Sequence, residues 1–169
     1  MITQVVADHI DKAPGPDAKP IVRPAAERDV QAIADVVNAH ARQGQLLPRS
    51  AENIRASLRS WLVAELDGKV VGIGSLLDMS PTLVEVRSLA VLPAYRSLGV
   101  GGVLVGGLVE RARQRGIPTV FALTRAVPFF ERLGFVVTDR QRFPEKVWTD
   151  CVICPLFDRC DETAVVLEL

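Results

Sequence analysis

A glycine-bearing turn near the middle of the chain constrains the fold more than any other feature. Its sequence is Arg96-Ser97-Leu98-Gly99-Val100-Gly101-Gly102, and it lies between an apolar run at 83–91 and a segment with helical spacing at 100–115. The first N–H groups of a helix lack partners within the helix, and they lie at the positive end of its dipole. Glycines at this point let a phosphate approach the main chain closely. The order of strand, turn and helix, with the positive charge of Arg96 at the mouth, therefore predicts a turn that holds a pyrophosphate.

A glycine-rich turn alone is weak evidence. This one lacks the Lys-Ser/Thr ending of a P-loop and the Gly-x-Gly-x-x-Gly spacing of a dinucleotide-binding turn. It resembles instead the Arg/Gln-x-x-Gly-x-Gly/Ala turn of the GNAT superfamily of acyl-CoA N-acyltransferases. The segment 89–96 (Leu-Ala-Val-Leu-Pro-Ala-Tyr-Arg) is similar to that family's strand-into-turn signature, and 129–135 (Phe-Phe-Glu-Arg-Leu-Gly-Phe) resembles its second hallmark. The alternative is a βαβ crossover whose turn binds nothing.

The charge and length of the chain narrow its class further. It has 169 residues, of which 20 are basic and 20 acidic, so it lacks the basic surplus of a nucleic-acid-binding protein. The length suits one domain with a real core, and the hydrophobic content of 49% indicates a globular rather than a disordered chain. No apolar stretch approaches the length of a membrane span, and the start at 1–4 lacks the charged region and apolar core of a signal peptide. We therefore expect a cytoplasmic protein without nucleic-acid or membrane partners.

Apolar periodicity and turn formers predict one α/β (α+β) domain at 21–169, preceded by a flexible tail at 1–20 that ends in a stretch rich in proline. Asp29 is a plausible N-cap for a helix that begins at Val30, and Ser50 for a second helix. The other expected helices are 100–115 and 128–133, and the expected strands are 21–26, 61–66, 69–77, 82–91, 119–123, 135–137 and 164–169. Asp67-Gly68 predicts a hairpin turn between the second and third strands. This order indicates a mixed central β-sheet with helices on both faces, which is also what the resemblance to the GNAT fold implies.

The resemblance also implies how the acyl donor, acetyl-CoA, is held. In the family, a splayed gap separates the strands that correspond to 83–91 and 119–123, and the pantetheine amides bond to the free strand edge. The residues that the resemblance assigns to acetyl-CoA are Leu89, Ala90 and Val91 on that edge, the turn residues Arg96, Ser97, Leu98, Gly99, Val100, Gly101 and Gly102, and Phe130. Phe129 and Phe130 either line the acyl pocket or pack in the core.

Glu85 is the best candidate for the catalytic base, because many GNAT enzymes carry an acidic residue at this strand position. A carboxylate within an apolar strand is suited to taking a proton from an amine. The alternative is that Glu85 pairs with a neighbouring arginine or faces solvent. Many relatives use a tyrosine before Gly-Phe as the general acid, but Tyr95 is the only tyrosine in this chain and belongs to the turn signature. A coenzyme A thiolate is a good enough leaving group that positioning alone can suffice.

Three further segments are similar to the acetyltransferase domain of N-acetylglutamate synthases. They are Leu46-Leu47-Pro48-Arg49-Ser50, Leu123-Thr124-Arg125 and Pro144-Glu145-Lys146-Val147-Trp148. Glu145 replaces the serine of the family's Ser-Lys-Val ending, and Arg125 replaces its second threonine. The match from about residue 21 onward lacks an amino-acid-kinase domain, so it is closest to the short, stand-alone synthases.

These segments supply the cations that a dicarboxylate substrate needs. The candidates for substrate binding are Arg49, Arg87, Arg125 and Lys146, with Arg142 a weaker one. The resemblance implies acetyl transfer to L-glutamate, the first step of arginine biosynthesis. The alternatives are another small amine or a protein N-terminus as acceptor, or an acetyl-CoA-binding regulator without turnover. The oligomeric state, including a homodimer, stays open.

Three cysteines, Cys151, Cys154 and Cys160, crowd into one short segment. With a carboxylate they could supply four zinc ligands, but the second Cys-x-x-Cys pair of a strong zinc signature is missing. We expect reduced thiols, with a redox-sensitive pair as an open alternative, and no metal.

Overall fold

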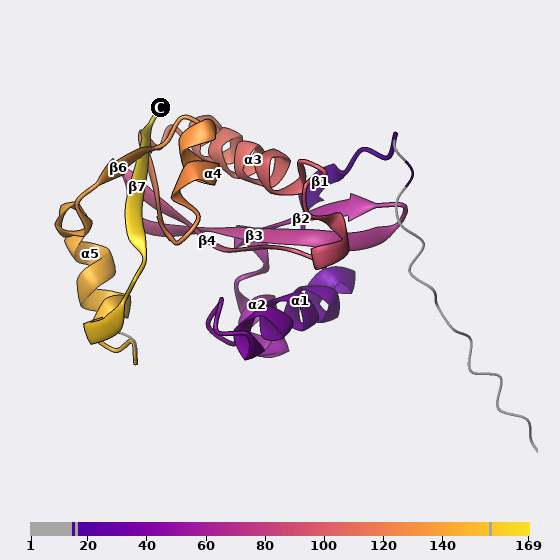
Figure 1. Ribbon diagram of the computed structural model, residues 1–169, viewed down its shortest axis with the longest axis horizontal. Helices are drawn as coiled ribbons and strands as arrows, with labels where there is room; N and C mark the ends of the chain where they lie inside the picture. Colours follow the sequence, from indigo (N-terminus) through magenta and orange to yellow (C-terminus); the bar gives the residue numbers. More distant parts are fainter. Residues whose placement is uncertain (1–14, 16, 156) are drawn as a thin grey trace, which may run out of the picture.

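Seven strands form one mixed sheet, and helices cover both of its faces, as the sequence predicts (Figure 1). The computed structural model describes residue 15 and residues 17–155 and 157–169. The strand order is β1-β2-β3-β4-β5-β7-β6. The strands are β1 (Ile21–Pro24), β2 (Trp61–Leu66), β3 (Lys69–Ser80), β4 (Leu83–Val91), β5 (Thr119–Thr124), β6 (Val136–Thr138) and β7 (Thr163–Glu168). The α-helices are α1 (Val30–Arg42), α2 (Ala51–Ala56), α3 (Val100–Gln114), α4 (Val127–Arg132) and the single turn α5 (Pro144–Lys146).

The alternation of side chains along β2 explains why both faces are covered. Trp61 and Val63 belong to a buried cluster with residues of α1 and α2, whereas Leu62, Ala64 and Leu66 belong to a second cluster with residues of α3. Successive side chains of a strand point to opposite faces, so a strand that is apolar throughout needs a cover on each side. In Figure 1 the helices α1 and α2 lie on one face, and α3 and α4 lie on the other.

Local turn chemistry acts as predicted at two points and differently at a third. Asp67 and Gly68 both have positive φ in the hairpin turn, and the Ser50 side chain accepts a hydrogen bond from the Asn53 N–H at the start of α2. Asp29 occupies the N-cap position of α1, as predicted, but its side chain makes no capping hydrogen bond to this helix. Its carboxylate instead accepts hydrogen bonds from the Ala26 N–H at 2.7 Å and from the Arg23 guanidinium at 2.7 and 2.9 Å. The bonds from Arg23 hold the pKa of Asp29 below its ordinary value.

The sheet opens between β4 and β5. These strands pair in parallel at Leu83–Glu85 with Thr119–Phe121, and the register of the described residues ends there. On its other side β4 has an irregular register with β3, where one residue of β3 lies opposite two of β4. Ser88 lies at this bulge with a positive φ of 53°, rare for a residue other than glycine. A bulge bends its strand and increases the local twist, so this one accounts for the divergence of β4 from β5.

The C-terminal segment closes the open side of the sheet. After β6 the chain forms α5 and a π-helical turn at Val147–Cys151, and in Figure 1 this segment lies beside β7 at one end of the sheet. Phe143 anchors it by stacking on Phe121 of β5, with ring centroids 4.1 Å apart. The sequence analysis predicted no helix here.

Residues 1–14 and 16 of the expected N-terminal tail lie outside the described residues. Residues 17–20 form neither helix nor strand, and Ala18 packs against the core cluster beneath α3. Within the described part of the chain, no helix combines the length and apolar character needed to cross a bilayer.

Candidate active site

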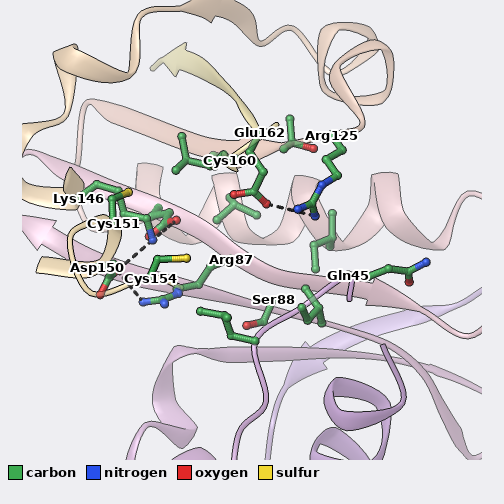
Figure 2. Close-up of a pocket in the computed structure, with 18 of the residues that line it drawn as sticks. Gln45, Arg87, Ser88, Arg125, Lys146, Asp150, Cys151, Cys154, Cys160 and Glu162 are labelled. Atoms are coloured by element: carbon green, nitrogen blue, oxygen red, sulfur yellow. Dashed lines mark hydrogen bonds and ion pairs between the residues drawn. The ribbon is translucent and has the colours of Figure 1, made fainter. Parts of the chain in front are cut away.

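A cavity of about 620 Å³ lies where β4 and β5 diverge (Figure 2). Its volume lies within the range typical of small-molecule sites. The walls are formed by the facing edges of β4 and β5 and by the start of α4. The segment between β6 and β7, which includes α5, and the loop between α1 and α2 complete them. We call residues 43–49 of that loop the acceptor loop. The cavity is therefore built from segments far apart in sequence, around the opening in the sheet.

The free edge of β4 forms one wall. Val86, Arg87, Ser88 and Leu89 line the cavity, and residues 122–126 of β5 and its following turn face them. Ala90 and Val91 continue the strand beyond the cavity towards residues 96–102, which we call the donor turn. The unpaired main-chain groups of such an edge are suited to hydrogen bonding with the amides of an extended ligand. Phe129 and Phe130 both line the cavity; Phe130 belongs to the core cluster, and Phe129 is partly buried and packs against it.

The donor turn has the backbone conformation of an anion site. Ser97 and Gly99 both have positive φ, and Gly99 is the N-cap of α3. The Val103 N–H bonds to the Gly99 carbonyl at 3.1 Å, which leaves the earlier N–H groups, those at 100–102, without a helical acceptor. A left-handed residue followed by a helical one turns successive N–H groups in the same direction. Such groups are suited to binding an anion, and the assignment of this turn to a pyrophosphate stays a prediction.

The absence of a side chain at Gly101 also has a role in packing, which the sequence analysis did not predict. A Cβ atom at this position would lie 3.2 and 3.3 Å from two ring atoms of Phe129, and 3.9 Å from Val91. The first two distances are tighter than ordinary van der Waals contact. The missing side chain therefore lets α3 pack closely against α4, in addition to leaving its N–H group accessible.

A buried ion pair joins Glu85 to Lys146, so the alternative that Glu85 pairs with an arginine or faces solvent does not hold. Both side chains are nearly inaccessible, and the Lys146 Nζ atom lies 2.9 and 3.1 Å from the two carboxylate oxygens of Glu85. Lys146 also donates to Asp150 at 2.9 Å, and Asp150 lies 3.5 Å from Arg87 (Figure 2). Burial opposes ionisation of Asp150, but the bond from Lys146 and the surrounding positive charges outweigh it and lower the pKa of this carboxyl.

Arg49 adds a positive charge to the wall of the cavity. Its main chain is fixed by Asn38, whose side chain bonds to both the N–H and the carbonyl of Arg49 at 3.2 and 2.9 Å. The Arg49 Nη1 atom donates to Asn53 at 3.1 Å, but the buried Nε atom finds no hydrogen-bond partner among the described residues. Burial, followed by the charge of nearby Arg87, lowers the pKa of the Arg49 guanidinium.

The remaining arginine candidates differ in placement. Arg125 lines the cavity, but its Nε atom donates to Asp161 at 2.6 Å. Arg142 pairs with Glu168 and is not among the residues that line the cavity, so the structure does not bring this weaker candidate to the site.

Two acidic residues that line the cavity, Asp150 and Glu162, were missed by the sequence analysis. Burial raises the pKa of Glu162, and the charge of Arg125, whose Nη1 atom lies 3.8 Å from the Glu162 carboxylate, opposes the rise only in part. Glu162 directly follows the Cys160-Asp161 pair, and this proximity to a thiol-rich segment was the only sequence signal that pointed to it. A carboxyl group with a raised pKa inside a cavity is a second candidate for taking a proton.

All three cysteines line the same cavity (Figure 2). Arg140 donates from Nη2 to the Cys160 Sγ atom at 3.3 Å, and burial raises the pKa of the Cys151 thiol. The described residues contain no group of three or more His, Cys, Asp or Glu side chains arranged to hold a metal ion. The three thiols are free in the structure.

We expect a thiol reagent at neutral pH to modify Cys154 and Cys160 before Cys151. Cys151 is 8% exposed and, with a raised pKa, carries less of the reactive thiolate, whereas the other two are half-buried. Acetyl-CoA and an acceptor that fill the cavity should slow the reaction. Mass spectrometry of peptides sampled over time gives the order, and modification of Cys151 first would contradict the arrangement.

Comparison with known proteins places this geometry among acetyltransferases. Residues 30–135 match the acetyltransferase (GNAT) family. An uncharacterized N-acetyltransferase of Chlorobaculum tepidum is 38% identical over 154 residues, which cover 91% of this chain and 99% of the relative. An amino-acid acetyltransferase of Mycobacterium tuberculosis is 38% identical over 122 residues, or 70% of each protein. The solved N-acetylglutamate synthase of Neisseria gonorrhoeae, complexed with coenzyme A and N-acetyl-glutamate, aligns with a TM-score of 0.79 at 27% identity, over 90% of this chain and 36% of that one.

Proposed function

This chain belongs to the GNAT family of acetyl-CoA-dependent acetyltransferases, and from that premise we propose that it acetylates the α-amine of L-glutamate, the first step of arginine biosynthesis, in the cytoplasm. The observation that carries the choice of acceptor is the buried, unpartnered Nε atom of Arg49. A buried donor without a partner is costly, and a carboxylate is the partner that a guanidinium binds best. The name of the M. tuberculosis relative supports an amino acid as the acceptor, and that of the N. gonorrhoeae N-acetylglutamate synthase supports glutamate.

The charge balance of the cavity supports an acceptor with two carboxylates. The described lining includes five basic side chains and three acidic ones. A site with this excess of positive charge favours an amino acid with two carboxylates over one whose side chain is neutral or positively charged. We assign Arg49, Arg87 and Lys146 to the two carboxylates of the acceptor. We do not assign Arg125 to them, because its Nε atom already donates to Asp161.

In the proposed reaction, the amine nitrogen of glutamate attacks the carbonyl carbon of the acetyl thioester, and the thiolate of coenzyme A leaves. The free edge of β4 and the donor turn hold the donor, and the cations opposite hold the acceptor so that its nitrogen points at the thioester. No tyrosine is among the described residues of the cavity wall, so the leaving thiolate takes its proton from elsewhere or departs unprotonated.

The amine must lose a proton before or during attack, and we propose Glu85 as the group that takes it. Glu85 is the last residue of β4 that pairs with β5, so it lies where the two strands part. Glu85 pairs with Lys146 in the structure, and a substrate carboxylate that binds Lys146 would compete for the same ammonium group. Glu162 is the competing candidate, favoured by its raised pKa.

Arg49→Gln should raise the KM for glutamate at least about tenfold, because a charge-assisted bond to a carboxylate is lost. The KM for acetyl-CoA should change little. Arg142→Gln is the matched control, since Arg142 pairs with Glu168 away from the cavity, and its kinetics should resemble those of the wild type. Arg49 is a cleaner test than Lys146, whose loss would also leave Glu85 and Asp150 buried without their partner.

The wild-type protein should also prefer glutamate strongly over glutamine and leucine in an assay that follows release of the free thiol of coenzyme A. Equal turnover of the three amino acids would refute the assignment to glutamate and favour another small amine or a protein N-terminus. Binding of acetyl-CoA without turnover of any acceptor would favour a regulator instead.

A further inference from the structure

His40 is a buried polar residue on α1 that the proposed reaction does not use. It is 7% exposed, and both nitrogens of its ring have partners. The Nδ1 atom lies 2.8 Å from the Val36 carbonyl oxygen, one turn earlier in the helix. The Nε2 atom lies 3.4 Å from Nη2 of Arg96, the first residue of the donor turn.

The chemistry of these partners determines the state of the imidazole ring. A carbonyl oxygen can only accept a hydrogen bond, so Nδ1 must carry the hydrogen. A guanidinium group can only donate, so Nε2 must present its lone pair to Arg96. The tautomer that satisfies both contacts carries its hydrogen on Nδ1, and in this tautomer Nε2 accepts a hydrogen bond from Arg96.

Arg96 is held at two points by this arrangement. Its Nε atom donates to the Val91 carbonyl at 3.4 Å, at the end of β4, and its Nη2 atom donates to His40. Arg96 is otherwise exposed, and an exposed arginine loses much side-chain entropy when it is fixed by a ligand. Two anchors before the ligand arrives reduce that loss.

The main chain around His40 is also fixed. Its carbonyl oxygen accepts hydrogen bonds from the N–H groups of Gln43 and Gln45 at 3.1 and 3.0 Å, at the point where α1 ends and the acceptor loop begins. The imidazole ring therefore extends from a well-anchored helix end, which makes it a rigid support for the Arg96 side chain.

We propose that His40 is a positioning residue for acetyl-CoA: it holds the Arg96 guanidinium in the orientation that binds the pyrophosphate. The proposal rests on the assignment of Arg96 to that pyrophosphate, which is independent of the identity of the acceptor. His40 itself touches neither substrate.

The test compares two variants, His40→Leu and His40→Gln, in calorimetric binding of coenzyme A. Leucine fills the space but removes the acceptor, so affinity should fall about three- to tenfold, the loss expected for one hydrogen bond. Glutamine carries an amide oxygen near the position of Nε2 and should restore most of the affinity. Melting temperatures of both variants report whether the fold is intact.

Two further measurements separate positioning from a general structural defect. Acetyl-pantetheine lacks the pyrophosphate, so its KM as a donor should be the same for wild type and His40→Leu. His40→Leu should weaken binding of coenzyme A in the wild type but have little further effect in the Arg96→Ala background, because His40 acts only through the Arg96 side chain. Equal losses with both donors, or additive effects of the two substitutions, would overturn the proposal. Unchanged affinity of Arg96→Ala would overturn its premise and leave the choice of acceptor unaffected.

Discussion

Glu85→Gln should lower kcat about 10²- to 10⁴-fold, which is the range for loss of a general base. Glutamine keeps the shape of the side chain but cannot take the proton of the amine. The loss should shrink as pH rises, because a larger fraction of the amine is already neutral. Rapid-quench measurements of the acetylated product across a pH series would give both the size of the loss and its slope.

Glu162→Gln is the comparison variant for this experiment, since both carboxylates line the same cavity. If Glu85 is the base, Glu162→Gln should retain most of the wild-type kcat. The Glu162→Gln substitution should also remove the contribution of Glu162 to the pH dependence of the free energy of unfolding. Because the pKa of Glu162 is raised in the folded protein, this residue destabilises the fold as pH rises above the ordinary pKa of 4.5. A normal kcat for Glu85→Gln together with a large loss for Glu162→Gln would assign the base to Glu162.

Gly101→Val should weaken acetyl-CoA binding by up to about a hundredfold. Its Cβ atom would meet the Phe129 ring at 3.2 Å, and its branched methyl groups would need further space between α3 and α4. Movement of either helix displaces the N–H groups of the donor turn, and small misplacements in a binding site have effects of this size. Calorimetric titration with coenzyme A measures the loss.

Gly106→Val provides the matched control on the same helix. A Cβ atom at Gly106 has no neighbour within 4 Å, so this variant makes the same change of residue type within α3 without the contact to Phe129. Its affinity for coenzyme A should equal that of the wild type. If the two valine variants bind coenzyme A equally well, the donor turn is not the pyrophosphate site.

Features that depend on neighbouring residues in the sequence were predictable. The Asp67-Gly68 turn and the Ser50 cap act through main-chain groups one to three residues away, so their residue types carry the signal. Asp29 has the same residue type as a cap, but Arg23 lies close enough to attract its carboxylate. That competition depends on how β1 packs beside α1, which no local pattern records.

The parts of the site that escaped prediction depend on distant partners. Lys146 and Glu85 were both proposed from sequence, but their ion pair joins residues 61 positions apart. The bulge at Ser88 has no glycine to mark its positive φ, and the role of Glu162 depends on burial by segments on either side. The two motifs at 89–102 and 129–135 could be recognised from the sequence, because each lies within a short stretch of consecutive secondary-structure elements.

The opening between β4 and β5 has a consequence for the folding stability of the protein. Where the two strands part, a central strand of the sheet has main-chain groups whose natural partner is another chain of amides. An acyl donor whose amides take up those groups supplies the missing hydrogen bonds of the sheet, and so becomes a temporary part of the fold. Its binding free energy is then added to the free energy of unfolding, in proportion to the logarithm of donor concentration. The concentration of acetyl-CoA would thus set part of the folding stability of this protein.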